Sequence, residues 1–139
     1  MQRILALDVG EKRIGVAVSD PLGLTAQGVE TIFTQGWSND RARVKQLANQ
    51  YQTDRLLIGL PKSMSGEIGP QAQRVQEFAA RLVEDGLKVR YWDERLTTVS
   101  AHRALIEGDL SRRKRKQVVD KVAAVYILQG FLDAGGWKD

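Results

Sequence analysis

Three carboxylates in this chain occupy positions that a purely solvent-exposed role does not explain, and Asp8 is the first. It lies near the end of an apolar run over residues 3–9 and is followed by a glycine-bearing turn. Burying an acid among hydrophobic residues is costly unless the carboxylate is paired, hydrogen-bonded or bound to a metal. Gly10 and Gly15 carry no side chain, so a phosphate or another backbone segment could approach Asp8 closely. We therefore predict that Asp8 lies at the edge of a functional site.

Glu94 and Asp120 are the other two candidates. Glu94 comes just after a predicted strand over residues 87–92. Its neighbour Asp93 competes for the same role, but strand alternation would point the two side chains in opposite directions. Asp120 begins an apolar stripe on the last predicted helix, with a helix cap as its alternative role. The stripe continues at helical spacing through Ala123, Ala124, Ile127 and Phe131.

Together the three acids predict a metal site. Ligands of open α/β sheets gather at the carboxyl ends of strands, where Asp8 and Glu94 fall, and the last helix could bring Asp120 alongside. Three oxygen ligands, in a chain with no cysteine and a single histidine, suit Mg²⁺ or Mn²⁺ rather than zinc. Two such ions roughly 3.5–4 Å apart can clamp a phosphodiester without a nucleophilic side chain. The predicted chemistry is therefore phosphodiester hydrolysis.

Basic side chains are placed to bind a nucleic-acid backbone. Lys62 follows the predicted fourth strand, and the Arg95 guanidinium can grip a phosphate bidentately or pair with a nearby acid. The net charge is +4, and five successive residues form what we call the basic cluster: Arg112, Arg113, Lys114, Arg115 and Lys116. Such a run adds sequence-independent, salt-sensitive affinity for nucleic acid. A solvated loop that only aids solubility is the alternative.

The elements that must position these residues alternate along the chain. Glycine-bearing turns join predicted strands at 3–9, 13–19 and 27–33 into an antiparallel meander. Apolar periodicity then predicts helices at 38–52, from Pro70 to Gly86, at 98–107 and at 118–132, with strands at 55–60 and 87–92 between them. The basic cluster is expected in a loop before the last helix. This order predicts an α/β fold: a five-stranded mixed sheet, antiparallel and then parallel, with helices on both faces.

Size and composition narrow the protein class. A chain of 139 residues with 42% hydrophobic residues fits one domain over 1–139. No stretch approaches the roughly 20 apolar residues that span a bilayer, and no signal-peptide pattern precedes the first strand. The absence of cysteine excludes disulfides and thiol catalysis. A cytoplasmic protein is expected, and the oligomeric state stays open between monomer and homodimer.

Four segments taken together resemble one known family. They are residues 5–10 with 13–20, residues 58–61 with Gly66, residues 93–98, and residues 120–128. Their order and content are similar to the YqgF/RuvX family of proposed pre-16S rRNA nucleases, which is related to Holliday-junction resolvases of the RNase H-like fold. The resemblance implies metal-dependent cleavage of nucleic acid and maturation of the 5′ end of 16S rRNA. It places the family's acidic positions on Asp8, Glu94 and Asp120.

The chain also departs from its relatives. Ser65 stands where the family commonly has an acidic residue, so no metal is assigned to it. Resolvases of the superfamily carry an acid at the end of the fourth strand, here residues 59–61, and two acids three apart in the last helix, where Ala123 follows Asp120. These differences weaken the alternative of a four-way-junction DNA endonuclease, which would favour a symmetric dimer.

Two further alternatives remain from the sequence. A non-catalytic RNA-binding module of the same fold would keep the basic surface but hold too few metal ligands for turnover. The first hairpin also resembles the phosphate loop of actin- and hexokinase-like ATPases, whose two domains 139 residues do not accommodate.

Overall fold

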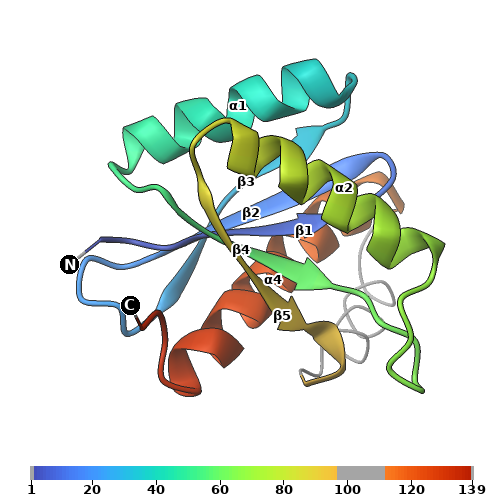
Figure 1. Ribbon diagram of the computed structural model, residues 1–139. Coiled ribbons are helices and arrows are strands. Elements are labelled where there is room, and N and C mark those ends of the chain that lie inside the picture. Colours follow the sequence, from blue (N-terminus) through green and yellow to red (C-terminus); the bar gives the residue numbers. More distant parts are fainter. Residues whose placement is uncertain (1, 97–111, 139) are drawn as a thin grey trace.

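A five-stranded mixed sheet forms the centre of the structure (Figure 1). The computed structural model describes residues 2–96 and 112–138, with side chains from residue 122 onward in the second range. The strands are β1 (Leu5–Val9), β2 (Arg13–Ser19), β3 (Ala26–Phe33), β4 (Arg55–Leu60) and β5 (Lys88–Asp93). They lie in the order β3-β2-β1-β4-β5. The first three pair antiparallel, and β4 pairs in parallel with β1 and β5, so the predicted α/β class and mixed sheet are confirmed.

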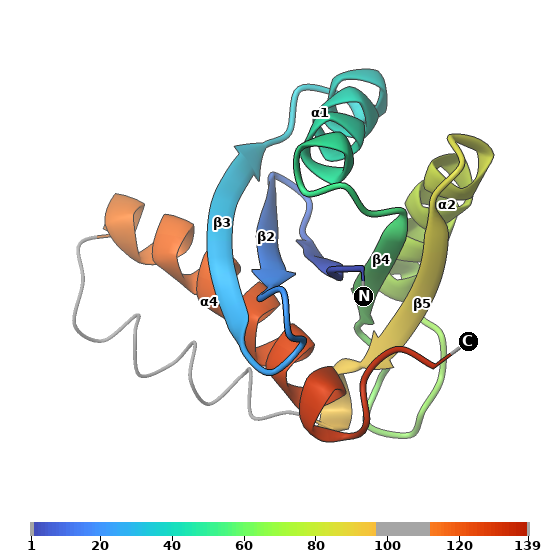
Figure 2. The ribbon, with the colours of Figure 1, turned by 90° about the vertical axis from the view of Figure 1, so that its left-hand side faces the viewer.

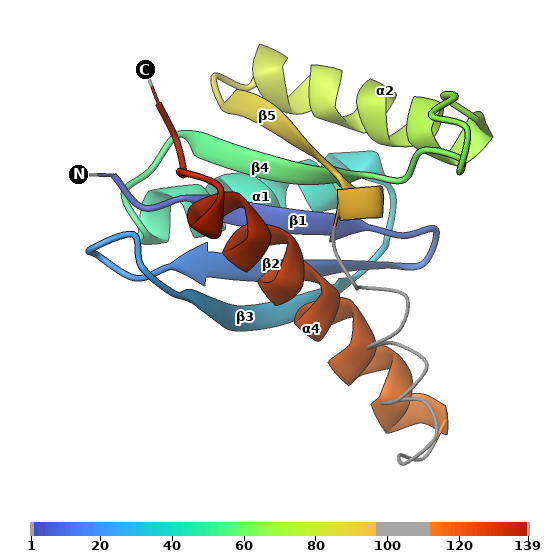
Figure 3. The same ribbon diagram turned by 90° about the horizontal axis from the view of Figure 1, so that it is seen from below.

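Helices cover both faces of this sheet. Helices α1 (Trp37–Gln50) and α2 (Pro70–Glu84) lie on one face, and α4 (Arg112–Asp133) crosses the other (Figure 2, Figure 3). Helix α2 begins at a proline, whose fixed φ and missing N–H suit a first turn, and its buried residues recur at helical spacing. Among the helices of the described ranges, none has the length and apolar content needed to cross a membrane.

The central strand β1 is buried along its whole length because it has a neighbour on each side and helices on both faces. Leu5, Leu7 and Val9 point into the core beneath α1 and α2. Ile4 and Ala6 point into the core beneath α4. Because side chains alternate along a strand, this pattern places Asp8 on the α4 face.

The start of the last helix differs from the prediction. Helix α4 begins at Arg112 rather than at residue 118, so the backbone of the basic cluster is helical, and its expected placement in a loop is wrong. Arginine and lysine have high helix propensity, and residues 112–117 include no glycine or proline to end a helix. The predicted strands 13–19 and 55–60 have the observed bounds. The predicted helix 98–107 lies outside the described residues.

We expect Phe78 on α2 to be a main support of the α1–α2 layer. Its side chain is 1% exposed, and its ring lies 5.7 Å from that of Trp37 on α1. Phe78→Ala should lower the free energy of unfolding by about 3–5 kcal/mol because the cavity cannot fully close. Val83→Ala is the matched control on the same helix, since Val83 is 54% exposed and its truncation should cost no more than about 0.5 kcal/mol. Urea denaturation measures both, and equal effects would contradict this packing.

Candidate active site

Asp8 stands on the α4 face near the carboxyl end of β1 and is 7% exposed. Its partner across the antiparallel pair with β2 is Gly15. On the other side, Leu7 pairs with Ile58 of β4, so Gly59 is the next residue along that strand. Both neighbouring strands therefore place a glycine beside the Asp8 position. Glycines inside strands often mark positions that another segment or a ligand approaches closely.

Glu94 lies on the same face of the sheet. It opens the 3₁₀ turn η1 (Glu94–Leu96), directly after β5. A Cβ atom at Gly59 would lie 3.3 Å from Cγ and from Cδ of Glu94. It would also lie 2.6 Å from Cδ1 of Ile127, a buried residue of α4. The Glu94 side chain therefore passes over Gly59, next to Ile127, beside the strand that carries Asp8.

Asp120 is placed only through its backbone. It lies in α4, seven residues before Ile127, so about 10 Å separates the two along the helix axis. Its side chain lies outside the described residues. Within the described part of the chain, no three His, Cys, Asp or Glu side chains form a group that could hold a metal ion. Asp120 stays the predicted third ligand of the metal site that the sequence places on Asp8 and Glu94.

Asp93 does not share the position of Glu94. Its carboxylate receives the Arg95 guanidinium, with Nη2 at 2.6 Å from Oδ2 and Nε at 3.1 Å from both oxygens. This pairing lowers the pKa of Asp93 and raises that of Arg95. Of the two roles that the sequence left open for Arg95, the structure shows the pairing with an acid.

The structure gives less detail on Lys62 and on the basic cluster. Lys62 lies two residues beyond β4, and its N–H donates to the Leu60 carbonyl oxygen at 3.0 Å. After Arg95, the charge of Lys62 also contributes to the lowered pKa of Asp93, so Lys62 lies near that carboxylate. The basic cluster begins α4, but its side chains lie outside the described residues.

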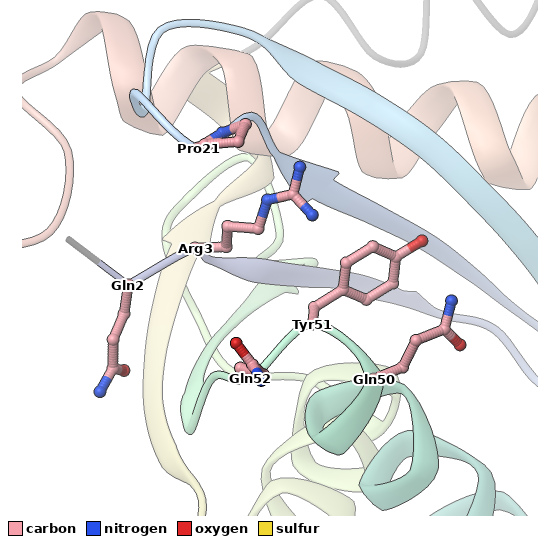
Figure 4. A pocket seen from close by; sticks show the side chains of 6 residues that line it. All are labelled: Gln2, Arg3, Pro21, Gln50, Tyr51 and Gln52. Carbon is pink, nitrogen blue, oxygen red and sulfur yellow. The ribbon is translucent and has the colours of Figure 1, made fainter.

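A cavity of about 400 Å³ lies at the opposite edge of the sheet (Figure 4). Gln2 and Arg3, which precede β1, face Tyr51 and Gln52, which follow α1, and the Arg3 guanidinium lies 5.4 Å from the centre of the Tyr51 ring. None of its lining residues carries a carboxylate. This cavity is therefore separate from the acidic edge that holds Asp8 and Glu94.

Sequence reasoning missed the role of Gly59. The only local signal is a glycine inside the apolar run of β4, where a glycine often marks a close approach of another segment. Which segment approaches depends on how α4 and η1 pack, and the run itself carries no information on that.

The chain is similar to a known protein family over most of its length. Residues 2–134 match the family model described as RuvX, Holliday junction resolvase. Proteins named "Putative pre-16S rRNA nuclease" from Clostridium tetani and Moorella thermoacetica are both 56% identical to this chain, and the matches cover 95% and 96% of it and 96% of each relative.

Among solved structures, Thermus thermophilus RuvC in complex with a Holliday junction substrate has a TM-score of 0.62 at 13% identity, with 99% of both chains covered. A second Thermus thermophilus RuvC structure has a TM-score of 0.59 at 14% identity, with 96% of this chain and 97% of that chain covered. At these identities the likeness concerns the fold alone, and it confirms the predicted RNase H-like fold.

We expect Gly59→Ala to displace the side chains of Ile127 and Glu94, because the added methyl group would meet both. Overpacking of this kind lowers the free energy of unfolding by about 1–3 kcal/mol. Ile127→Val removes the Cδ1 atom that lies closest and should cost about 0.5–1.5 kcal/mol alone. The double variant should therefore be destabilised by less than the sum of the two single variants. Urea denaturation of all three variants checks this, and additive effects would show that the two positions do not meet.

Proposed function

Because the chain belongs to the RuvX (YqgF) family, we propose that it is a metal-dependent nuclease that processes the 5′ end of pre-16S rRNA. The observation that carries the proposal is the placement of Asp8 and Glu94 on one face of the sheet, beside Gly59 and under α4. The names of the relatives suggest the RNA substrate, and the carboxylates supply the chemistry.

The donors at this edge fit a hard divalent cation. Asp8 is almost fully buried and Glu94 is partly buried, and both offer carboxylate oxygens on the same face. A buried carboxylate is stabilised by a bound cation, and oxygen donors suit Mg²⁺ and Mn²⁺. Asp8, Glu94 and Asp120 would hold such an ion, which supplies Lewis-acid polarisation of the phosphate and neutralises its charge.

The protein's own residues bind and orient the substrate. Lys62 lies at the carboxyl edge of the sheet, where its ammonium group can contact a backbone phosphate. The basic cluster begins the helix that also carries Asp120, so a strand bound along α4 would lead toward the acidic edge. Contacts of this type position a nucleic acid without recognising its sequence, so the shape of the precursor or a bound partner selects the cleavage site.

A four-way-junction endonuclease is the second candidate, and the observation that favours it is the description of the matched family as Holliday junction resolvase. Its substrate is DNA with two-fold symmetry, which would call for a homodimer with paired sites. Substrate choice therefore separates the two candidates.

We expect purified protein to cut 5′-leader fragments of pre-16S rRNA with Mg²⁺ or Mn²⁺ and not with EDTA. Removing even a hydrogen-bond partner of a metal ligand costs roughly 10- to 100-fold in affinity or activity. Asp8→Asn, Glu94→Gln and Asp120→Asn should therefore each lower the cleavage rate by more than about 100-fold. Glu11→Gln is the control, since Glu11 is an exposed acid in the turn after β1.

Cleavage that persists in folded Asp8→Asn protein, or in EDTA, would contradict this metal site. Cleavage of four-way DNA junctions without cleavage of RNA would move the function to DNA. RNA binding without any cleavage would favour the non-catalytic binding module.

The basic cluster should set the salt dependence of RNA binding. When its five residues are replaced by glutamine, which also favours helix, the slope of log K against log salt should fall by about 0.7 for each phosphate of single-stranded RNA that the cluster neutralises. Lys45→Gln is the control, because Lys45 is exposed on α1 at the other face of the sheet. Fluorescence anisotropy at several salt concentrations measures the slope. An unchanged slope in the five-residue variant would mean that this cluster is only a solvated helix end.

A further inference from the structure

The two residues that flank Glu94 are joined to each other. The Asp93 carboxylate accepts the backbone N–H of Arg95 at 3.0 Å and the Arg95 side chain through Nε and Nη2. These contacts close a ring around Glu94, which lies between the two residues in the chain. The backbone conformation of the η1 turn is therefore held by a charge-assisted bidentate pair.

Arg95 also contacts the loop that follows β4. Its Nη1 group donates to the Met64 carbonyl oxygen at 3.5 Å. A Cβ atom at Gly66 would lie 3.2 Å from the same Nη1, and Gly66 has a φ of +86°, which disfavours any side chain there. The Gly66 N–H donates to the Ser63 carbonyl oxygen at 2.9 Å, which closes the loop on itself. The Arg95 guanidinium thus contacts both the η1 turn and the tight loop that follows β4.

This arrangement leaves Arg95 poorly suited to bind a phosphate. The Nε and Nη2 groups that would grip an anion bidentately already hold Asp93, whose side chain is 17% exposed. The negative charge of Asp93 also compensates the charge of the guanidinium, so the pair adds little attraction for a polyanion. Lys62, at the start of the same loop, keeps the role of phosphate contact.

We infer that Arg95 is a positioning residue: paired with Asp93 and braced on Gly66, it fixes Glu94 for metal binding and ties the Lys62 loop to the η1 turn. The inference rests on the proposed function for the role of Glu94. It replaces the expectation that Arg95 contacts substrate. The pair is partly exposed, and such pairs contribute little to global stability, so its variants should remain folded.

The test compares Arg95→Gln, Asp93→Asn and the double variant. Mn²⁺ binding without RNA is followed by electron paramagnetic resonance, and RNA affinity is measured in EDTA. Both single variants should weaken Mn²⁺ binding by about 10- to 100-fold, as removal of a ligand's support does. The double variant should bind Mn²⁺ no more weakly than the single variant with the lower affinity, because each substitution alone already removes the Asp93–Arg95 pair. RNA affinity should change by less than about 2-fold.

The sign of the Arg95 effect separates positioning from simple electrostatics. Removing a cation near carboxylates would by charge alone strengthen Mn²⁺ binding, whereas a mispositioned Glu94 weakens it. Lys62→Gln is the contrasting variant, expected to weaken RNA binding without weakening Mn²⁺ binding, because it removes a cation and leaves the Asp93–Arg95 pair in place. If Arg95→Gln bound Mn²⁺ more tightly, or bound RNA more weakly with unchanged Mn²⁺ affinity, the inference would be overturned. The proposed metal site would be unaffected by either result. A wild-type protein that binds no Mn²⁺ would overturn the proposed metal site, and the inference with it.

Discussion

Two side chains pack over residue 59 because it has no side chain of its own. A Cβ atom there would lie 2.6 Å from Cδ1 of Ile127, closer than packed atoms allow, so a larger residue would force that side chain to shift. The same position leaves room for the carbon chain of Glu94, which crosses β4 at that point. One glycine thus leaves space both for a side chain of α4 and for the path of a candidate metal ligand. The same helix carries Asp120, the third predicted ligand.

Several carboxylates lie close to this contact, at one edge of the sheet. The three parallel strands β1, β4 and β5 end at one edge, and the acids Asp8, Asp93 and Glu94 lie at or just beyond their ends. Each acid has a different environment. Asp8 is buried on the central strand, Glu94 lies over Gly59, and Asp93 holds Arg95. Neighbouring carboxylates therefore divide into two for which we propose cation binding and one that is paired with an arginine.

The same edge divides the basic residues in a similar way. Arg95 is paired with Asp93, whereas for Lys62 at the start of the loop we propose a contact with the substrate backbone. The basic cluster lies farther along the chain at the beginning of α4. A division of this kind would let the proposed nuclease hold a negatively charged substrate close to carboxylates, because local cations offset the repulsion where the backbone binds.

The sequence by itself determined the sheet and the acids at its edge. Apolar runs and their alternation are local properties, so the strands at 13–19 and 55–60 and the strand-end position of Asp8 could be predicted. The tertiary structure decided the partner of Arg95 and the use of Gly59. The Asp93–Arg95 pair and the contact at Gly59 join residues whose choice of partner depends on how η1, α4 and the β4–α2 loop pack. From the sequence, either a phosphate or a carboxylate could be the partner of Arg95. The packing of the side chains selects the carboxylate, because it brings Asp93 within hydrogen-bond distance.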